Sequence, residues 1–278
     1  MTADDRPRAD LPPGPVLPDP EGGTPSTGIA LPAVAPAPGA PELHAEPAAR
    51  PQGAPPGPAW FVVGTDTGVG KTHACCALLH ALARRHARVV GMKPVAAGGV
   101  ETPEGFASED SIAHRAASTI KVLPELDCPV LLPEPLSPHL AAAHAGVRID
   151  LATIVAAYAQ LRMQADAIVV EGAGGFLVPL SETETGADLA VALGLPVVLV
   201  VGMRLGCLNH ALLTADAIRA RGLELAGWIA NRIDPDFLCP EENLEYLRAR
   251  LGAPLWADLP WSAAPEPRRD ADRFALPD

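Results

Sequence analysis

The sequence carries too little positive charge for a nucleic-acid-binding protein. Its 21 Lys and Arg residues against 33 Asp and Glu residues give a net charge of -12 at pH 7, and no basic stripe is present to neutralise phosphate groups. Long apolar runs are missing as well, since none reaches the roughly 18 residues that would span a bilayer. We therefore expect neither a nucleic acid nor a membrane among its partners.

Paired cysteine motifs are also absent. The chain has 5 cysteines, an odd number, with no C-x-x-C pair among them, so neither a disulfide framework nor a zinc site is predicted. The N-terminus lacks the basic start and the apolar run of about 7 to 15 residues that mark a secretory signal, and it is too acidic for a transit peptide. Together these features are typical of reduced thiols in a cytoplasmic protein.

Residues 1–58 are rich in proline and have no apolar periodicity. They hold 16 of the chain's 32 prolines, and such a segment cannot bury enough surface to offset its ordering entropy. We predict a disordered Pro/Ala/Gly-rich N-terminal extension over 1–58, which is either dispensable or a partner-binding arm. Residues 59–278 are enough for one sizeable domain.

From Trp60 onward, short β-rich runs alternate with longer helical patterns. Near-continuous Val and Ile runs bounded by glycine, such as AIVVEG and PVVLVVG, are typical of strands buried on both faces of a parallel sheet. The sequence therefore predicts one doubly wound α/β domain. The predicted strands are residues 60–64, 88–93, 167–172, 196–202, 225–231 and 254–259. The predicted helices are residues 71–86, 109–117, 150–164, 186–193, 207–221 and 241–251.

In such a domain, ligands bind at the carboxyl ends of the strands. In chain order, the first five predicted strands are followed by GTDTGVGKT, KPVAAGG, EGAGG, GMRLGCLNH and NRID. These five segments are therefore expected to meet at one edge of the sheet.

The first of these segments, GTDTGVGKT (64–72), predicts a phosphate site. A strict P-loop reads G-x-x-x-x-G-K-[ST], and Gly64 stands one residue too early for it. The other requirements are met, because Gly68 and Gly70 can expose backbone N–H groups at a helix N-terminus, Lys71 can reach the β and γ phosphates, and Thr72 can bind a metal ion. Since the segment lies between a predicted strand and a predicted helix, it indicates a nucleotide-binding domain of P-loop NTPase type.

Three charged residues lie near the same predicted edge. Glu171 ends a buried strand, where nucleotide-hydrolysing folds place a carboxylate beside Mg²⁺; the alternative is a solvated turn residue. Lys93 ends another strand and could neutralise charge that develops in phosphoryl transfer, or it could be an ordinary surface lysine. On pattern alone Asp110 is an N-cap or first-turn residue of a helix. Cys75, Cys76 and the histidines, His114 among them, show no metal spacing and are interpreted as structural.

Taken together, these motifs resemble those of the dethiobiotin synthetase family. The resemblance extends from Trp60 to about Trp261 and includes GTDTGVGKT, GMKPVAAG, TPEG, SPH, VEGAGG and LVVGMRLGCLNHALLTA in this order. The longer gap between glycines is normal in that family. The resemblance implies an ATP-dependent ligase that forms a carbamate from CO₂ and 7,8-diaminononanoate (7,8-diaminopelargonic acid), phosphorylates it to a carbamic-phosphoric anhydride, and closes the ring of dethiobiotin. This is the penultimate step of biotin biosynthesis.

The resemblance also assigns roles to residues of this chain. It implies that Lys71 and Lys93 bracket the carbamate and the transferring phosphoryl group, and that Thr67 contacts the carbamate. Mg²⁺ would be held by Thr72, Asp110 and Glu171. The ATP-binding residues it implies are Gly68, Val69, Gly70, Lys71, Thr72, Asp110, Glu171, Asn231 at the adenine, Leu259, Pro260 and Trp261.

The family works as a homodimer whose substrate lies across the interface. A helix start on the partner chain would receive the substrate carboxylate, a use that suits a helix N-terminus. The substrate-binding residues implied are Thr67, Lys93, Ala97, Leu205, Gly206, Cys207, Leu208, Asn209 and Tyr246.

One departure from the family and three alternatives stay open at this point. Ala97 stands where relatives often have serine, which removes a hydroxyl donor worth about 0.5 to 1.5 kcal/mol if that bond exists. The chain could therefore be a nucleotide-binding module without activity. A regulatory ATPase switch of the partitioning type would carry lysine where this chain has Asp66. An amide-forming cobyrinate-type synthetase would need a further glutaminase domain.

Overall fold

The computed structural model describes residues 57–103 and 105–277. Residues 1–56, which make up most of the predicted disordered extension, lie outside the described residues. Within the described ranges, no helix has both the length and the apolar character that a membrane span requires.

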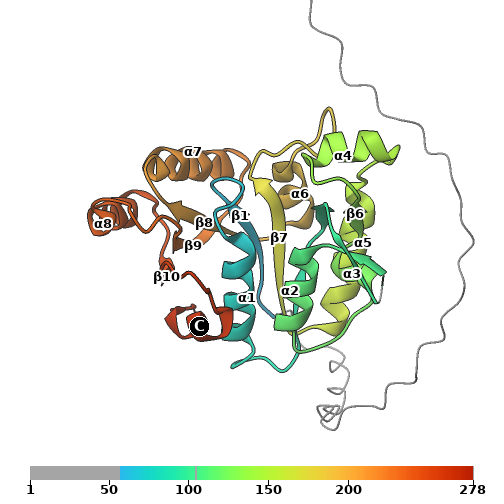
Figure 1. Cartoon of the computed structure of the whole chain (residues 1–278), viewed down its shortest axis with the longest axis horizontal. Helices are drawn as coiled ribbons and strands as arrows, with labels where there is room; N and C mark the ends of the chain where they lie inside the picture. Colours follow the sequence, from blue (N-terminus) through green and yellow to red (C-terminus); the bar gives the residue numbers. More distant parts are fainter. Residues whose placement is uncertain (1–56, 104, 278) are drawn as a thin grey trace, which may run out of the picture. The chain divides into compact units, whose positions relative to one another are not determined.

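A sheet of 6 parallel strands forms the centre of the domain, in the order β10-β9-β8-β1-β7-β2 (Figure 1). The strands are β1 (Ala59–Gly64), β2 (Val89–Met92), β7 (Ala167–Gly175), β8 (Val197–Met203), β9 (Leu225–Arg232) and β10 (Leu255–Leu259). All six correspond to predicted strands. Because β1 lies between β7 and β8, the segment that follows β1 opens at the middle of the carboxyl edge, where ligands of such sheets bind.

Helices cover both faces of this sheet. Along β1, Trp60 and Val62 pack in the apolar core under α1, whereas Phe61 and Val63 pack in the opposite core under α5, α6 and α7. This alternation is what a strand buried on both faces requires, and it confirms the doubly wound α/β prediction. The helices that match predicted ones are α1 (Lys71–Leu82), α2 (Glu109–Ala117), α5 (Leu151–Gln164), α6 (Gly186–Leu193), α7 (Cys207–Ala220) and α8 (Pro240–Arg250).

Several short elements between β2 and α5, and after β10, are not predicted from the sequence. A parallel pair β3–β6 and an antiparallel hairpin β4–β5 extend the region that follows β2. Most of these elements have three or four residues, and segments of that length are too short to show a periodicity. The additional elements are β3 (Val95–Ala97), β4 (Val100–Thr102), β5 (Gly105–Ala107), α3 (Pro124–Asp127), β6 (Val130–Leu132), α4 (Pro138–Ala145), α9 (Pro267–Asp270) and the 3₁₀ turn η1 (Ala271–Arg273).

Two boundaries differ from the prediction in ways that affect the site. Helix α1 ends at Leu82 instead of residue 86, because the chain turns there. Strand β7 continues to Gly175, so EGAGG is part of a strand and not a loop. It does so by resuming its pairing with β1 beyond an irregularity, where Gly64 lies opposite Gly175. The glycines of β7 therefore lie directly beside the start of the phosphate loop.

Candidate active site

The segment GTDTGVGKT forms a turn between β1 and α1 at the carboxyl edge of the sheet. Gly68 and Gly70 have φ angles of 74° and 80°, a left-handed conformation that favours glycine. Gly70 is the residue before the first turn of α1, so the N-terminal N–H groups of α1 face the space enclosed by this turn. Lys71 folds back over it and donates from Nζ to the backbone oxygen of Asp66 at 3.0 Å. The turn thus has the form of a phosphate-binding loop.

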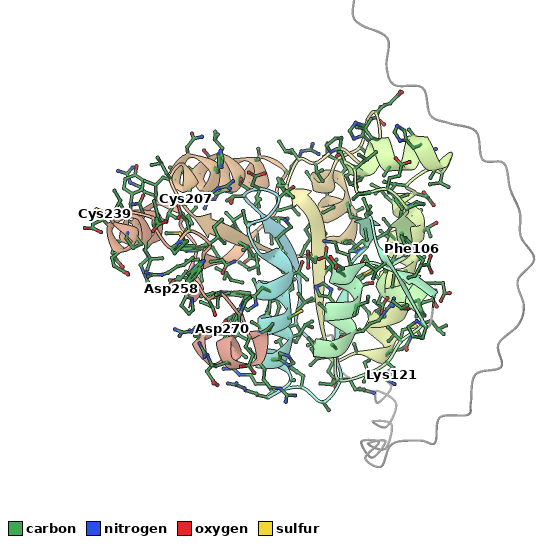
Figure 2. All side chains as sticks on the ribbon, viewed as in Figure 1. Phe106, Lys121, Cys207, Cys239, Asp258 and Asp270 are labelled. Carbon is green, nitrogen blue, oxygen red and sulfur yellow. The ribbon has the colours of Figure 1, made fainter. Side chains whose placement is uncertain are left out.

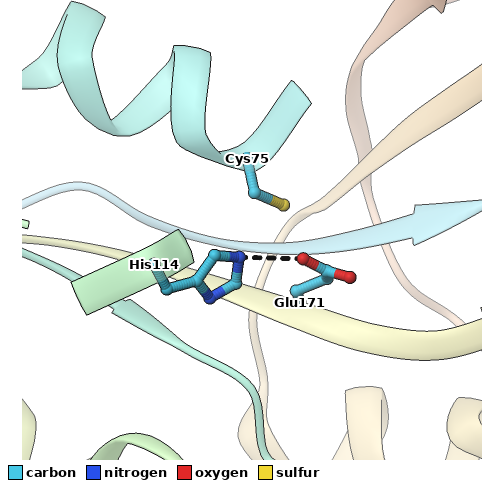
Figure 3. A group of neighbouring side chains, drawn as sticks. All are labelled: Cys75, His114 and Glu171. Carbon is cyan, nitrogen blue, oxygen red and sulfur yellow. Dashed lines mark ion pairs between the residues drawn. The ribbon is translucent and has the colours of Figure 1, made fainter. Parts of the chain in front are cut away.

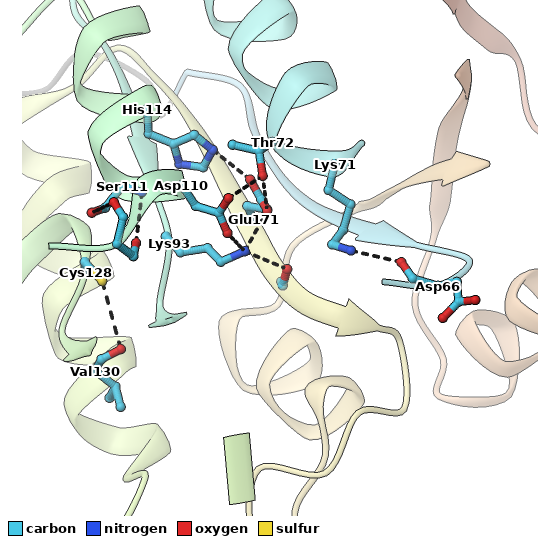
Figure 4. A network of polar contacts seen from close by, with 12 residues as sticks. Asp66, Lys71, Thr72, Lys93, Asp110, Ser111, His114, Cys128, Val130 and Glu171 are labelled. Atoms are coloured by element: carbon cyan, nitrogen blue, oxygen red, sulfur yellow. Dashed lines mark hydrogen bonds and ion pairs between the residues drawn. The ribbon is translucent and has the colours of Figure 1, made fainter. Parts of the chain in front are cut away.

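Glu171 of β7 and Asp110 of α2 converge on the first turn of α1 (Figure 4). The hydroxyl of Thr72 lies 2.7 Å from Oδ1 of Asp110 and 3.1 Å from Oε1 of Glu171. Lys93, just beyond β2, joins the same group, with Nζ 2.6 Å from Oε1 of Glu171 and 2.7 Å from Oδ2 of Asp110. Four side chains predicted from separate segments therefore meet in one cluster beside the phosphate loop. We call Thr72, Lys93, Asp110 and Glu171 the carboxylate cluster.

The sequence allows Asp110 to be either the N-cap or a first-turn residue of its helix, and the structure separates the two. Ser108, not Asp110, caps α2, because its side chain accepts a hydrogen bond from the backbone N–H of Ser111. Asp110 lies in the first helical turn, and its carboxylate points toward Thr72 and Lys93. The first-turn interpretation is confirmed and the N-cap interpretation is wrong, because serine two residues earlier already satisfies the helix start.

Burial and charge act in opposite directions within the cluster. Burial alone would raise the pKa of Glu171, which is 1% exposed, but attraction to Lys93 and contact with His114 hold that pKa well below its ordinary value. Burial alone would lower the pKa of Lys93, yet the charges of Glu171 and Asp110 raise it above its ordinary value. Lys93 and Glu171 are therefore both ionised at neutral pH. The pKa of Lys71 is lowered, first by burial and then by repulsion from Lys93.

The donor atoms of this cluster suit a hard divalent cation. Two carboxylates lie within hydrogen-bond distance of one hydroxyl at the mouth of the phosphate loop. Mg²⁺ prefers oxygen ligands of this kind together with the phosphates of a nucleotide. Thr72, Asp110 and Glu171 therefore fit Mg²⁺. The two carboxylates share the single ammonium of Lys93, which leaves a surplus of negative charge for a cation.

One member of this site does not follow from the sequence. The sequence pattern indicates a structural role for His114, but the structure places its Nε2 2.8 Å from Oε2 of Glu171, with both side chains 1% exposed (Figure 3). The sulfur of Cys75 lies within 4.8 Å of both groups. A signal is present in the sequence, because His114 follows Asp110 by four residues and Cys75 follows Thr72 by three, spacings that share one helix face.

The regions predicted for the base and the second substrate flank the carboxylate cluster. Asn231 at the end of β9 donates from Nδ2 to the backbone oxygen of Val69 at 2.8 Å, so it lies against the phosphate loop. Trp261, beyond β10, lines a cleft of about 230 Å³ with Met203, Phe237 and others. Ala97 lines a cleft of about 320 Å³ that also contains Asp110.

The segment Leu205 to Asn209 begins α7 and is tied to the phosphate loop. Arg204 donates from Nη2 to Oδ2 of Asp66 at 2.8 Å, and the neighbouring Leu205 is 91% exposed. Tyr246 is placed apart from these residues on α8, where its ring is covered by the guanidinium of Arg250 at 5.3 Å. Within one chain, the structure brings Tyr246 to none of the site residues described above.

Comparison with known proteins adds family information to this geometry. The sequence profile of a family described as an AAA domain matches residues 59–269. The chain is 55% identical over 221 residues to the "ATP-dependent dethiobiotin synthetase BioD" of Aromatoleum aromaticum. The alignment covers 79% of this chain and 97% of that protein. It is 54% identical over 224 residues to the protein of the same name from Xanthomonas axonopodis pv. citri. That alignment covers 79% of this chain and 98% of that protein.

Among solved structures, the chain is similar to a ParA family ATPase from Chlorobium tepidum TLS. The TM-score is 0.48 at 16% sequence identity, and the alignment covers 74% of this chain and 85% of that one.

Proposed function

The chain belongs to the ATP-dependent dethiobiotin synthetase family, and we propose that it forms dethiobiotin from 7,8-diaminononanoate, CO₂ and ATP, with release of ADP and phosphate. One amine of the diamine takes up CO₂ as a carbamate. The γ-phosphoryl group is transferred to a carbamate oxygen, which gives a carbamic-phosphoric anhydride. The second amine attacks the carbonyl carbon, phosphate leaves, and the ureido ring closes. The enzyme is thus an ATP-dependent ligase of biotin biosynthesis.

The observation that carries this proposal is the meeting of the carboxylate cluster with the phosphate loop. The reaction needs no covalent enzyme intermediate, so the protein contributes orientation and charge. Lys71 and Lys93 supply positive charge on two sides of the transferring phosphoryl group, and the N–H groups from Gly68 to Thr72 bind the phosphates. Thr67, at the outer side of the same loop, contacts the carbamate. Burial of Lys71 and Lys93, at 7% and 5% exposure, strengthens their effect on charge that develops near them.

Mg²⁺ is proposed as the metal cofactor, held by Thr72, Asp110 and Glu171. When bound it neutralises charge on the β and γ phosphates. The chemistry of the three donors supports this assignment, since all are oxygen atoms gathered at the end of the phosphate loop.

The two clefts beside the cluster are proposed for the base of ATP and for the diamine. The cleft with Trp261 offers an aromatic ring for the adenine, with Leu259 and Pro260 in the segment that leads to it. Asn231 has one amide hydrogen committed to Val69, and its second hydrogen and its oxygen are available for the edge of the base. The cleft with Ala97 and Asp110 opens on the other side of the cluster and suits the diamine.

We further propose that the enzyme is a homodimer with shared active sites. Three leucines on the α7 side of the domain, Leu177, Leu205 and Leu213, are 54%, 91% and 61% exposed. Two of them line a cleft together with Thr65, the second residue of the phosphate-loop segment. A second copy covering this surface would place the start of its α7, from Leu205 to Asn209, beside the diamine of the first, with Tyr246 also contributed from the partner. We expect the dimer to work in the cytoplasm, where its five free thiols stay reduced.

The function is tested by phosphate release in the presence of ATP, Mg²⁺, bicarbonate and the diamine. Release should require the diamine and should be accompanied by dethiobiotin in equal amount. Phosphate release that is independent of the diamine, with no dethiobiotin formed, would instead support a regulatory ATPase switch. Replacing Leu213 by Glu should yield monomers in sedimentation, whereas the same change at exposed Leu238, outside the proposed interface, should not.

A further inference from the structure

We propose that His114 is a positioning residue for Glu171, in that its imidazole fixes which carboxylate oxygen faces the metal and the transferring phosphoryl group. This inference rests on the proposed function, because it assigns a role within the same site. His114 itself touches neither Thr72 nor Lys93 among the contacts of the cluster. It acts through Glu171 alone.

The two oxygens of Glu171 have different surroundings (Figures 3 and 4). Oε1 faces the reaction site, with Nζ of Lys93 at 2.6 Å and the hydroxyl of Thr72 at 3.1 Å. Oε2 faces away, and its close polar neighbour is Nε2 of His114 at 2.8 Å. Neither atom has another hydrogen-bond partner among the described residues. Without the imidazole, Oε2 would lose this close polar neighbour, and rotation of the carboxylate would no longer be opposed from that side.

The packing around His114 indicates that this imidazole is not a generic core residue. Its Nδ1 is also buried without a hydrogen-bond partner in the described part of the chain, which is unfavourable compared with an apolar side chain of the same size. Strand β2 has glycine at position 91, and a Cβ there would come within 2.9 Å of Cβ and Cγ of His114. Glycine weakens a strand interior, so two unfavourable features accompany the imidazole at this position. Contact with Glu171 is the interaction that distinguishes it from an apolar side chain.

A different function for the same residues would be a soft-metal site. Cys75, His114 and Glu171 are all buried, and one ligand atom from each lies within 4.8 Å of the others. One observation argues against a soft metal ion there. Burial raises the pKa of the Cys75 thiol well above its ordinary value, which disfavours the thiolate that such an ion needs.

Two amide replacements separate positioning from packing. In His114→Gln, the side-chain amide can place an N–H donor near the position of Nε2, facing Glu171. In His114→Asn, the donor can reach only the position of Nδ1, which has no hydrogen-bond partner among the described residues of the native protein. Both variants lose the aromatic ring and bury an amide, so they share a packing defect. His80→Asn, on the partly exposed face of α1, controls for loss of a histidine outside the site.

The readout is binding of Mn²⁺, as a paramagnetic substitute for Mg²⁺, to the full-length protein saturated with ADP, followed by electron paramagnetic resonance. We expect His114→Asn to weaken Mn²⁺ binding by about 10-fold or more, while His114→Gln stays within about 3-fold of the native protein and His80→Asn is unchanged. Equal binding by all variants would overturn the proposal. So would equal losses in Gln and Asn, or stoichiometric zinc in the native protein that both variants lose. Diamine-dependent turnover of the native protein is measured separately, so a failure of the proposed function is recognised independently of this result.

Discussion

Replacing Lys93 by Gln tests the electrostatic core of the site. In the native protein, the ammonium lies between two carboxylates at 2.6 and 2.7 Å, and Glu171 on one side is 1% exposed. The amide of Gln can still donate a hydrogen bond but carries no charge. The variant therefore leaves the buried carboxylate of Glu171 without a charged partner, and only His114 stays beside its Oε2. The carboxylate of Asp110 is more exposed, so water can solvate it.

The expected loss of stability is large for a single substitution. Removing one partner of a buried ion pair destabilises proteins by about 3 to 5 kcal/mol, and the remaining hydrogen bond of the amide favours the lower end of that range. We therefore expect the free energy of unfolding to fall by about 3 kcal/mol at pH 7 in the absence of nucleotide and metal. Turnover should fall by a factor of at least about 100, because a preorganised charge at the transferring phosphoryl group is lost. Nucleotide binding should be largely retained, since the phosphate loop is unchanged.

The pH dependence of this loss has a definite sign. In the native protein the pKa of Glu171 is depressed and that of Lys93 is raised. The carboxylate therefore contributes stability above its unfolded pKa of about 4.3, and the ammonium contributes it below about 10.4. Between about pH 5 and 9 both contributions are fully present. In the variant, burial is no longer opposed by Lys93, so the pKa of Glu171 should be raised and protonation should relieve the unpaired charge. The stability difference between native protein and variant should then shrink as the pH falls from about 8 to about 5.

Urea unfolding followed by circular dichroism at several pH values measures this difference. Lys121→Gln is the matched control, because Lys121 is exposed and lies near the amino ends of the strands, away from the site (Figure 2); its effect should stay within about 0.5 kcal/mol. A loss of less than about 1 kcal/mol in Lys93→Gln at pH 7, or a difference that grows as the pH falls, would refute the reasoning. Turnover at the native rate would refute the role of Lys93 in the reaction.

Three further changes test other parts of the structure. Gly70→Ala should weaken ATP binding at least about 10-fold in calorimetry, because a Cβ at this left-handed position would lie 2.1 Å from Nδ2 of Asn231. Gly68→Ala is the control, because a Cβ there meets no atom within 4 Å. Its effect on binding should come from backbone strain alone. Gly227→Ala should lower the free energy of unfolding by about 1 to 3 kcal/mol, since its Cβ would meet the indole of Trp256 at 2.2 Å; an unchanged urea midpoint would contradict this. A chain that begins at residue 57 should keep the turnover and sedimentation behaviour of the full-length protein, and loss of either would assign residues 1–56 a role.

The amino-acid pattern is sufficient to predict the sheet and most of the carboxylate cluster, and the reason is topological. Parallel strands bring their carboxyl ends to one edge. Lys93 lies one residue beyond β2, Thr72 lies in the first turn of the helix that follows β1, and Glu171 lies in the carboxyl half of β7. The topology alone therefore places them together. Asp110 has no such anchor. It follows the hairpin β4–β5, elements too short to be predicted, and pattern alone assigns it only to a helix start. Its place in the cluster follows from the family resemblance alone.

Residues that act through a neighbour are harder to predict than those that contact ligands directly. The spacing of Asp110 and His114 indicates one helix face, but it does not say what that face packs against. The partner of His114 is Glu171, 57 positions later in the numbering of the chain. Their contact depends on the packing of α2 against α1 and β2 and on the missing side chain at Gly91. The role of a buried histidine that belongs to no sequence motif is therefore found only from the atom that it contacts in the folded protein, here an oxygen of Glu171.

Asp66 shows how the spacing of the phosphate loop bears on function. Regulatory switches of the partitioning type carry lysine at this position, whereas here its backbone oxygen accepts from Lys71 at 3.0 Å and its carboxylate accepts from Arg204 at 2.8 Å. Arg204 immediately precedes the segment Leu205 to Asn209, which is proposed to bind the partner's diamine. One residue of the phosphate loop thus contacts both a lysine at the phosphates and the start of α7. A lysine here would repel Arg204 and remove this contact between the phosphate loop and the start of α7, so the acid at this position fits the proposed ligase better than a regulatory switch.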